Sequence, residues 1–97
     1  MAKGYWVANV DVADPDAYQH YVQANAEAFG KYGANFLVRG GTAHQAEGTA
    51  RARIVVIEFK DFATAQACYD SPEYQKAKAL RDPVSDANLT IVEGWDG

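Results

Sequence analysis

The chain has 97 residues, 48% of them hydrophobic, and a net charge of −4 at pH 7, which fits one globular domain over residues 1–97. An acidic balance without a basic stripe argues against a nucleic-acid partner and against an anionic membrane surface. One cysteine cannot form an internal disulfide, and neither a signal peptide nor a membrane-spanning apolar run is present. We therefore expect a cytoplasmic protein.

The first half of the chain predicts a strand, a helix and a second strand. Tyr5–Val12 alternates so that one strand face is wholly apolar. Asp14 before a proline is typical of a helix start, and we expect that helix to run to about Tyr32, before a glycine. The second strand is Asn35–Arg39, which two glycines end or kink, with a continuation through Thr42–Ala46 as an alternative.

The third predicted strand, Arg51–Phe59, is the most apolar. Four apolar residues follow one another at 54–57, whereas a strand half-exposed to water would alternate. Both of its faces are therefore expected to be covered, which places it at the centre of a sheet.

The remaining elements complete a recognisable order. Asp61 is expected to cap a helix over Phe62–Tyr69, and Ser71 a second helical piece that ends near Arg81. Leu89–Trp95 is the last predicted strand. The order β-α-β-β-α-β predicts the α+β ferredoxin-like class, with helices on one face of a four-stranded antiparallel sheet in the order 4-1-3-2.

The same pattern predicts a homodimer. Two helices can cover only one face of the sheet, yet Val55 and Val56 point to opposite faces and both faces of their strand are apolar. Soluble monomers avoid a wide exposed apolar surface. The simplest arrangement that buries it is a twofold dimer with the two sheets face to face.

Five segments of the chain resemble domain-of-unknown-function family 1330, in the dimeric α/β-barrel superfamily. These segments are KGYW (3–6), FLVRGG (36–41), VIEF (56–59), CYDSPEY (68–74) and IVEG (91–94). The resemblance implies a small bacterial protein whose two sheets close a barrel in the dimer. It implies no particular reaction, because superfamily relatives include cofactor-independent monooxygenases, haem-degrading oxygenases, chlorite dismutases and muconolactone isomerases. It also implies a ligand cavity, between sheet and helices or within the barrel.

The candidate catalytic residues are Glu58 and Glu93. A tight turn before the third strand would place Arg39 opposite Val56 and diagonal to Glu58 on one face, unless a bulge reverses Arg39. Arg39 would then hold a substrate carboxylate, and Glu58, its pKa raised by apolar neighbours, would accept a proton. The order of the strands places Tyr5 and Glu93 near Glu58, at the same end of the sheet.

Four further residues are candidates for substrate binding: Tyr5 and Asn9 on the first strand, and Tyr69 and Tyr74 beside the break between the second-half helices. The two histidines lack a second ligand at metal-binding spacing, so no metal is predicted. No cofactor is predicted either.

Two functions from different classes remain open. The first is an enzyme that oxygenates or isomerises a small aromatic or dienyl metabolite without metal. The second is a non-catalytic homodimeric binding or accessory module in which Arg39 and Glu58 form a structural ion pair. An enclosed pocket with both carboxylates pointing inward would favour the first, and a filled core with that pair the second.

Overall fold

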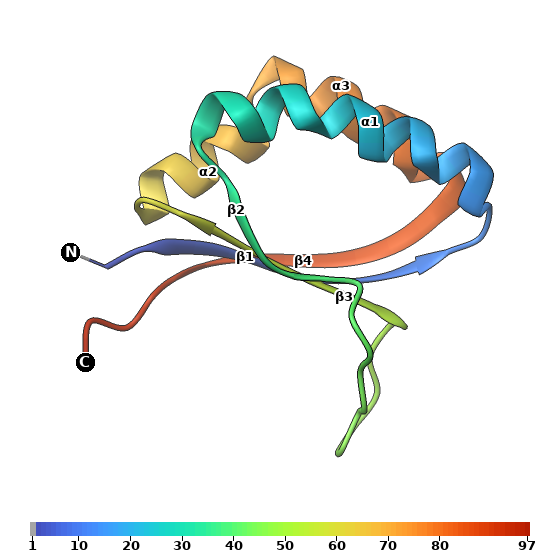
Figure 1. The fold of residues 1–97 in the computed structure, drawn as a ribbon, viewed down its shortest axis with the longest axis horizontal. Helices are drawn as coiled ribbons and strands as arrows, with labels where there is room; N and C mark the ends of the chain where they lie inside the picture. Colours follow the sequence, from blue (N-terminus) through green and yellow to red (C-terminus); the bar gives the residue numbers. More distant parts are fainter. Residues whose placement is uncertain (1) are drawn as a thin grey trace.

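The fold is a curved four-stranded sheet with all of its helices on one face, seen in a computed structural model that describes residues 2–97 (Figure 1). Met1, the first residue of the predicted domain, lies outside the described residues. Within residues 2–97 no helix is long and apolar enough to cross a membrane. The elements are β1 (Gly4–Val12), α1 (Pro15–Tyr32), β2 (Asn35–Arg39), β3 (Arg53–Phe59), α2 (Phe62–Asp70), α3 (Pro72–Arg81), a 3₁₀ turn (Asp82–Val84) and β4 (Ser85–Glu93).

The sheet has the order β2-β3-β1-β4, and its paired strands are antiparallel. This confirms the predicted α+β ferredoxin-like class and the central position of β3. The one clear error in an element lies in the last strand, which begins at Ser85 rather than Leu89 and ends at Glu93 rather than Trp95. Its early half carries polar residues on the uncovered face, and pairing along the whole of β1 keeps it extended despite them. Thr42–Ala46 is not a strand.

Each helix begins at the residue that its sequence predicts. The Asp14 carboxylate accepts from the Ala17 backbone N–H at 3.2 Å, and Asp61 accepts from Thr64 at 2.7 Å. Ser71 accepts from the Tyr74 backbone N–H at 3.1 Å. Such contacts satisfy backbone donors that the first turn of a helix leaves free.

The core lies between the helices and the sheet, and Trp6 of β1 is at its centre. Trp6 is 2% exposed, and its ring packs edge-on against Phe29 of α1 and Tyr74 of α3, with centroids 5.3 and 4.8 Å away. Its indole N–H donates to the Ala65 carbonyl of α2 at 2.8 Å. One strand residue therefore contacts all three helices and fixes the helix layer over β1.

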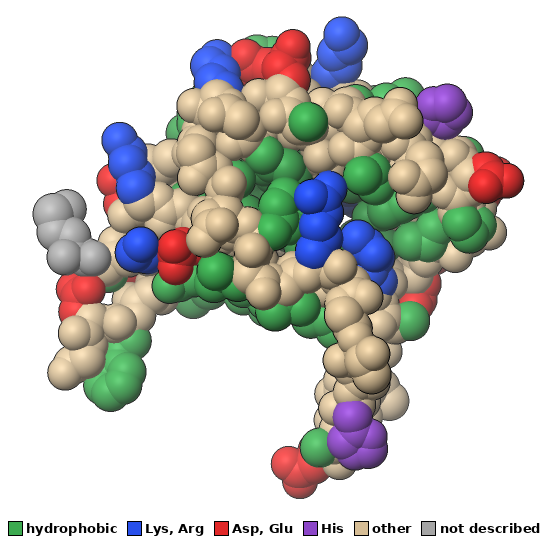
Figure 2. All heavy atoms as spheres, viewed as in Figure 1, with side chains coloured by type: hydrophobic (Ala, Val, Ile, Leu, Met, Phe, Trp, Pro, Cys, Tyr) green, Lys and Arg blue, Asp and Glu red, His purple; other side chains and the backbone are tan. Residues whose placement is uncertain are grey.

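The face of the sheet away from the helices is open; we call it the open face. It carries Val7, Ile54, Val56 and Val92, and Val7 and Val92 are 42% and 43% exposed. In Figure 1 the segment 40–52, here called the arm, and the C-terminal tail project beyond this face at opposite ends of the sheet. Figure 2 shows the hollow that results between the arm and the tail, with hydrophobic side chains along the open face; we call it the apolar recess.

The Ser71 hydroxyl supports both helices that meet at it, because it also donates to the Cys68 carbonyl at 2.7 Å. We expect Ser71→Ala to lower the free energy of unfolding by about 1–2 kcal/mol. Urea denaturation measures this loss. Thr42→Ala, in the exposed arm, is the control and should change stability by less than about 0.5 kcal/mol. Equal effects of the two substitutions would contradict the assignment.

Candidate functional site

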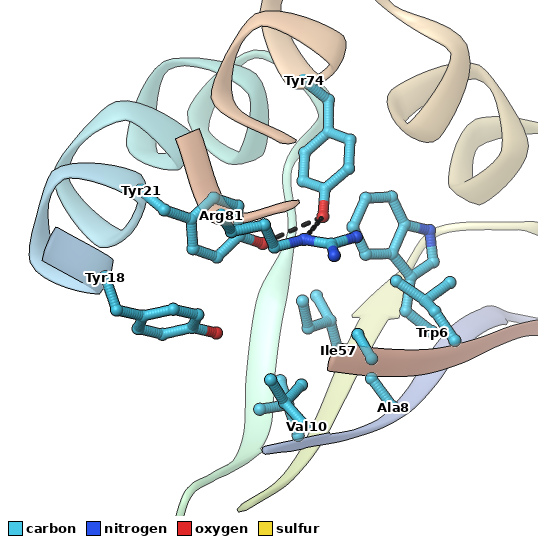
Figure 3. A pocket seen from close by; sticks show the side chains of 11 residues that line it. Trp6, Ala8, Val10, Tyr18, Tyr21, Ile57, Tyr74 and Arg81 are labelled. Atoms are coloured by element: carbon cyan, nitrogen blue, oxygen red, sulfur yellow. Dashed lines mark hydrogen bonds between the residues drawn. The ribbon is translucent and has the colours of Figure 1, made fainter. Parts of the chain in front are cut away.

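A narrow cavity between the sheet and two helices brings an arginine and three tyrosines together (Figure 3). We call it the α3-side cavity. Its walls are Tyr18 and Tyr21 of α1 and Tyr74 and Arg81 of α3. Its floor consists of side chains from β1, β3 and β4: Trp6, Ala8, Val10, Val55, Ile57, Ala87 and Leu89. The free space is about 30 Å³, room for one or two water molecules.

Helical spacing places these polar groups on the cavity. Tyr18 and Tyr21 are three residues apart on α1, and Tyr74 and Arg81 are seven apart, or two turns, on α3. Residues at such intervals share a helix face. The α3 face is kept close to the sheet by Ala77, which lies between the pair and is 1% exposed.

Two hydroxyl groups and the guanidinium form one chain of hydrogen bonds. The Tyr21 and Tyr74 oxygens are 2.9 Å apart, and Arg81 Nε donates to the Tyr74 hydroxyl at 3.4 Å. Arg81 is only 7% exposed, and its acidic contact is Asp82 at 3.4 Å, whose side chain is half exposed. The buried cation is therefore weakly neutralised.

Burial keeps Tyr18 and Tyr74 protonated. Loss of hydration raises the pKa of Tyr74 far above its ordinary value, and it raises the pKa of Tyr18 as well. A phenol that stays neutral at pH 7 can donate a hydrogen bond. With Arg81, the cavity thus offers donors and positive charge.

A second cavity of about 30 Å³ adjoins the first, toward the β2 edge of the sheet; we call it the β2-side cavity. The two share Tyr18, Tyr21, Val55 and Ile57 as lining residues. Arg39, Arg53 and the buried Asn25 line the second cavity alone. None of the residues that line either cavity is an aspartate, a glutamate or a histidine.

The predicted pairing of Arg39 with Glu58 is wrong, because the two side chains lie on opposite faces of the sheet. A bulge between Phe36 and Val38 adds one residue to β2, so that Arg39 lies opposite Val55 instead of Val56. Arg39 therefore faces the helices, with its guanidinium 4.0 Å from the centre of the Phe36 ring. The sequence suggested a bulge at the two glycines, and the actual one is closer to the start of the strand.

Glu58 lies on the open face and has other partners. Its carboxylate accepts from Lys3 Nζ at 3.2 Å and from the Tyr5 hydroxyl at 3.1 Å. Lys3 is the main cause of a lowered Glu58 pKa, and the Tyr5 hydroxyl contributes. The sequence predicted that apolar neighbours would raise the Glu58 pKa, and that prediction is wrong. The predicted proximity of Tyr5 and Glu58 is confirmed.

The other candidates are dispersed. Asn9 accepts from the Arg51 backbone N–H at 3.0 Å and from Asn88 at 3.2 Å, which fixes the base of the arm. Glu93 is exposed and pairs with Gly4 at the end of the sheet. Tyr69 packs on the Trp6 and Tyr74 rings, beside the cavity. Only Tyr74 and Arg39, among the predicted site residues, line the two cavities.

Sequence reasoning missed Arg81, Tyr21 and Arg53. The sequence places Tyr21 on the buried face of its helix, but it does not indicate that the hydroxyl meets one from another helix. A signal for Arg81 was present in the spacing of Tyr74, Ala77 and Arg81, which puts an arginine on a buried helix face.

Together, the fold and these cavities define a ferredoxin-like α+β protein with a basic, apolar space between helices and sheet. The chain belongs to the family described as Domain of unknown function (DUF1330), whose sequence profile matches residues 3–95. A search of the curated proteins found none that matches.

Solved structures share the fold at low sequence identity. The protein RPA0582 of Rhodopseudomonas palustris, of unknown function, is 17% identical with a TM-score of 0.72, over 99% of this chain and 85% of that one. A dimeric ferredoxin-like protein of unknown function from Thermobifida fusca is 18% identical (TM-score 0.62; 94% and 90% covered). SnoaB, a cofactor-independent oxygenase from Streptomyces nogalater, is 10% identical (TM-score 0.66; 100% and 97% covered).

The contacts of Glu58 predict a measurable pH dependence. Its pKa is lower in the folded chain than in the unfolded one, so these contacts stabilise the fold above the unfolded-state pKa. That contribution is lost as the pH falls through the folded-state pKa. An NMR titration of the Glu58 carboxyl should give a midpoint below that of an ordinary glutamate, and Lys3→Gln should raise it. A wild-type midpoint at or above the ordinary value would contradict these contacts.

Proposed function

We propose that the protein binds a small organic anion between its helices and its sheet, with Arg81 as the charged anchor. One observation carries the proposal: the two adjoining cavities are lined by Arg39, Arg53 and Arg81 and by no acidic side chain. The chain as a whole has 13 acidic and 9 basic residues, so this distribution is opposite to that of the rest of the protein. A space with positive charge and hydroxyl donors suits a carboxylate, a phenolate or an enolate.

The energetics of Arg81 favour this proposal. Removing an ion from water costs several kcal/mol unless a partner compensates it. The contacts of Arg81 with Tyr74 and Asp82 are both 3.4 Å long, which is beyond the usual range of a strong charged hydrogen bond. A ligand carboxylate could accept two parallel hydrogen bonds from the guanidinium and so compensate the burial of the charge.

Arg81 also lies between the inner cavity and a cleft on the protein surface. Together with Lys78, Asp82 and Asp86, it lines an outer cleft of about 400 Å³, as well as the inner cavity. The inner space is too small for an organic molecule as it stands. Withdrawal of the Arg81 side chain toward the outer cleft would enlarge the inner space and leave the guanidinium at its mouth, in contact with the ligand.

The likeness to a cofactor-independent oxygenase supports oxygenation of the bound ligand without a cofactor as the reaction class. Arg81 and the tyrosine hydroxyls would stabilise the anion that forms when such a substrate loses a proton. Glu58 and Glu93, the acceptors predicted from the sequence, lie outside the lining of both cavities. Their positions support binding as the primary function of the chain, with a substrate acidic enough to have lost its proton to water before it binds.

We also propose that the working form is a homodimer with the open faces in contact. The apolar recess between the arm and the tail supports a second copy as its occupant, as does the dimeric ferredoxin-like neighbour. Trp95 in the tail is 93% exposed and would be partly covered by such a partner.

A charge at the centre of the open face should separate the dimer. Val7 is 42% exposed and lies on a central strand, between Val56 and Thr90. We expect Val7→Asp to convert the dimer to a monomer in sedimentation equilibrium, because the dimer would bury the new carboxylate without a partner. Leu80→Asp, on α3 and 44% exposed, is the control and should stay dimeric. A wild-type monomer at micromolar concentration would refute the dimer.

Benzoate tests the anion site directly. We expect an NMR titration to show saturable shifts for benzoate and none for benzamide, the neutral analogue of the same shape. Arg81→Gln should weaken benzoate binding roughly tenfold or more, the scale of a charged hydrogen bond. Arg51→Gln, outside both cavities, and Glu58→Gln should bind as the wild type does. No benzoate binding, or equal binding by Arg81→Gln, would refute the proposal.

A further inference from the structure

We propose that the natural ligand is a dianion, a small molecule with an anionic group at each end, one held by Arg81 and the other by Arg39 and Arg53. This inference rests on the proposed function and adds a second anion subsite at the β2 edge. The middle of the ligand would lie between Tyr18 and Tyr21 above and Val55 and Ile57 below, since these four residues line both cavities. Such surroundings suit an apolar, planar centre.

The second subsite has two cations without acidic partners. Within residues 2–97, neither Arg39 nor Arg53 forms an ion pair. The Nε atoms of Arg51 and Arg53 are both buried without a hydrogen-bond partner, and of these two residues Arg53 is the one that lines the β2-side cavity. A buried donor without a partner is destabilising by about 1–3 kcal/mol, so its persistence calls for an explanation. An anionic group in the β2-side cavity would supply that partner.

The backbone at the end of β2 is shaped around Arg53. A Cβ atom at Gly40 would collide with Arg53 Nη1, so a side chain at this position would displace the end of the Arg53 guanidinium. Gly40 also has a φ of 70°, a conformation that other residues rarely adopt, and its N–H donates to the Ile54 carbonyl at 2.8 Å. The guanidinium of Arg53 therefore lies directly against the backbone at Gly40.

Arg53, like Arg81, lies between an inner cavity and an outer cleft. It lines the inner β2-side cavity and an outer cleft of about 290 Å³ with Val12, Pro15, Gln19 and others. Each end of the combined cavity thus has an arginine between an inner space and an outer cleft. Outward movement of both side chains would admit a ligand whose two ends then contact the two guanidinium groups.

Tyr18 connects the two ends. Arg53 and Arg81 both act to lower the pKa of this phenol against the effect of burial, so both lie within electrostatic range of it. The strands below the two ends are about two strand spacings apart, roughly 10 Å. Two anionic groups at opposite ends of one aromatic ring are closer together than this distance, and those at opposite ends of two linked rings are at least about as far apart.

The test uses matched pairs of probes that differ by one charge. Terephthalate is compared with 4-carbamoylbenzoate, and biphenyl-4,4′-dicarboxylate with its monoamide, by calorimetry on the full chain. We expect one of the diacids to bind at least tenfold more tightly than its monoamide. In Arg53→Gln and in Arg39→Gln this ratio should fall toward one. Arg51→Gln, the matched arginine control, should keep the ratio.

The outcomes separate this inference from the proposed function. If benzoate binds through Arg81 and neither diacid is preferred over its monoamide, the second subsite is refuted and the first stands. An unchanged ratio in both arginine variants refutes it too. If none of the anions binds, the proposed function fails as well. Arg39 is exposed, so Arg39→Gln decides the matter should Arg53→Gln fail to fold.

Discussion

The hydrogen bond between Tyr21 and Tyr74 is the interaction on which the rest of the site depends. It joins α1 to α3 above the sheet, 2.9 Å between oxygens that are 53 residues apart in the chain. Because the same Tyr74 hydroxyl accepts from Arg81, the contact that holds the helices together also positions the buried cation. Trp6 sets the height of this helix layer above β1. A polar contact thus sits inside an aromatic core, where an unpaired hydroxyl would be costly.

Local chemistry made most of the fold predictable from the sequence. Helix starts at Asp14, Asp61 and Ser71 depend on a residue and its neighbours three positions away, and all three are present. The alternation in β1 and the apolar run in β3 identify their strands because burial is periodic. β4 was harder, since its extended start at Ser85 is imposed by pairing with β1 rather than by its own residues.

The candidate site was less predictable, because it depends on single-residue register and on contacts across helices. One extra residue in β2 moves Arg39 from one face of the sheet to the other, and no local pattern at Leu37 announces that bulge. Glu58 was correctly placed beside Tyr5 but acquires Lys3 as its cation instead. The spacing along α3 assigns Arg81 and Tyr74 to one buried helix face. The hydrogen bond between Tyr74 and Tyr21 could not be predicted, because it depends on how α1 packs against α3.

The chain can be cut or extended in the arm without disturbing the core. Its residues 41–50 are all exposed and contribute nothing to the core, and its base is fixed by Asp11, which accepts from the Ala52 backbone N–H and pairs with Arg51. The strands on either side of it are joined by their own backbone pairing. A cut or an inserted segment near its tip would therefore leave both cavities intact, which makes the arm the natural place to attach a label or a second domain.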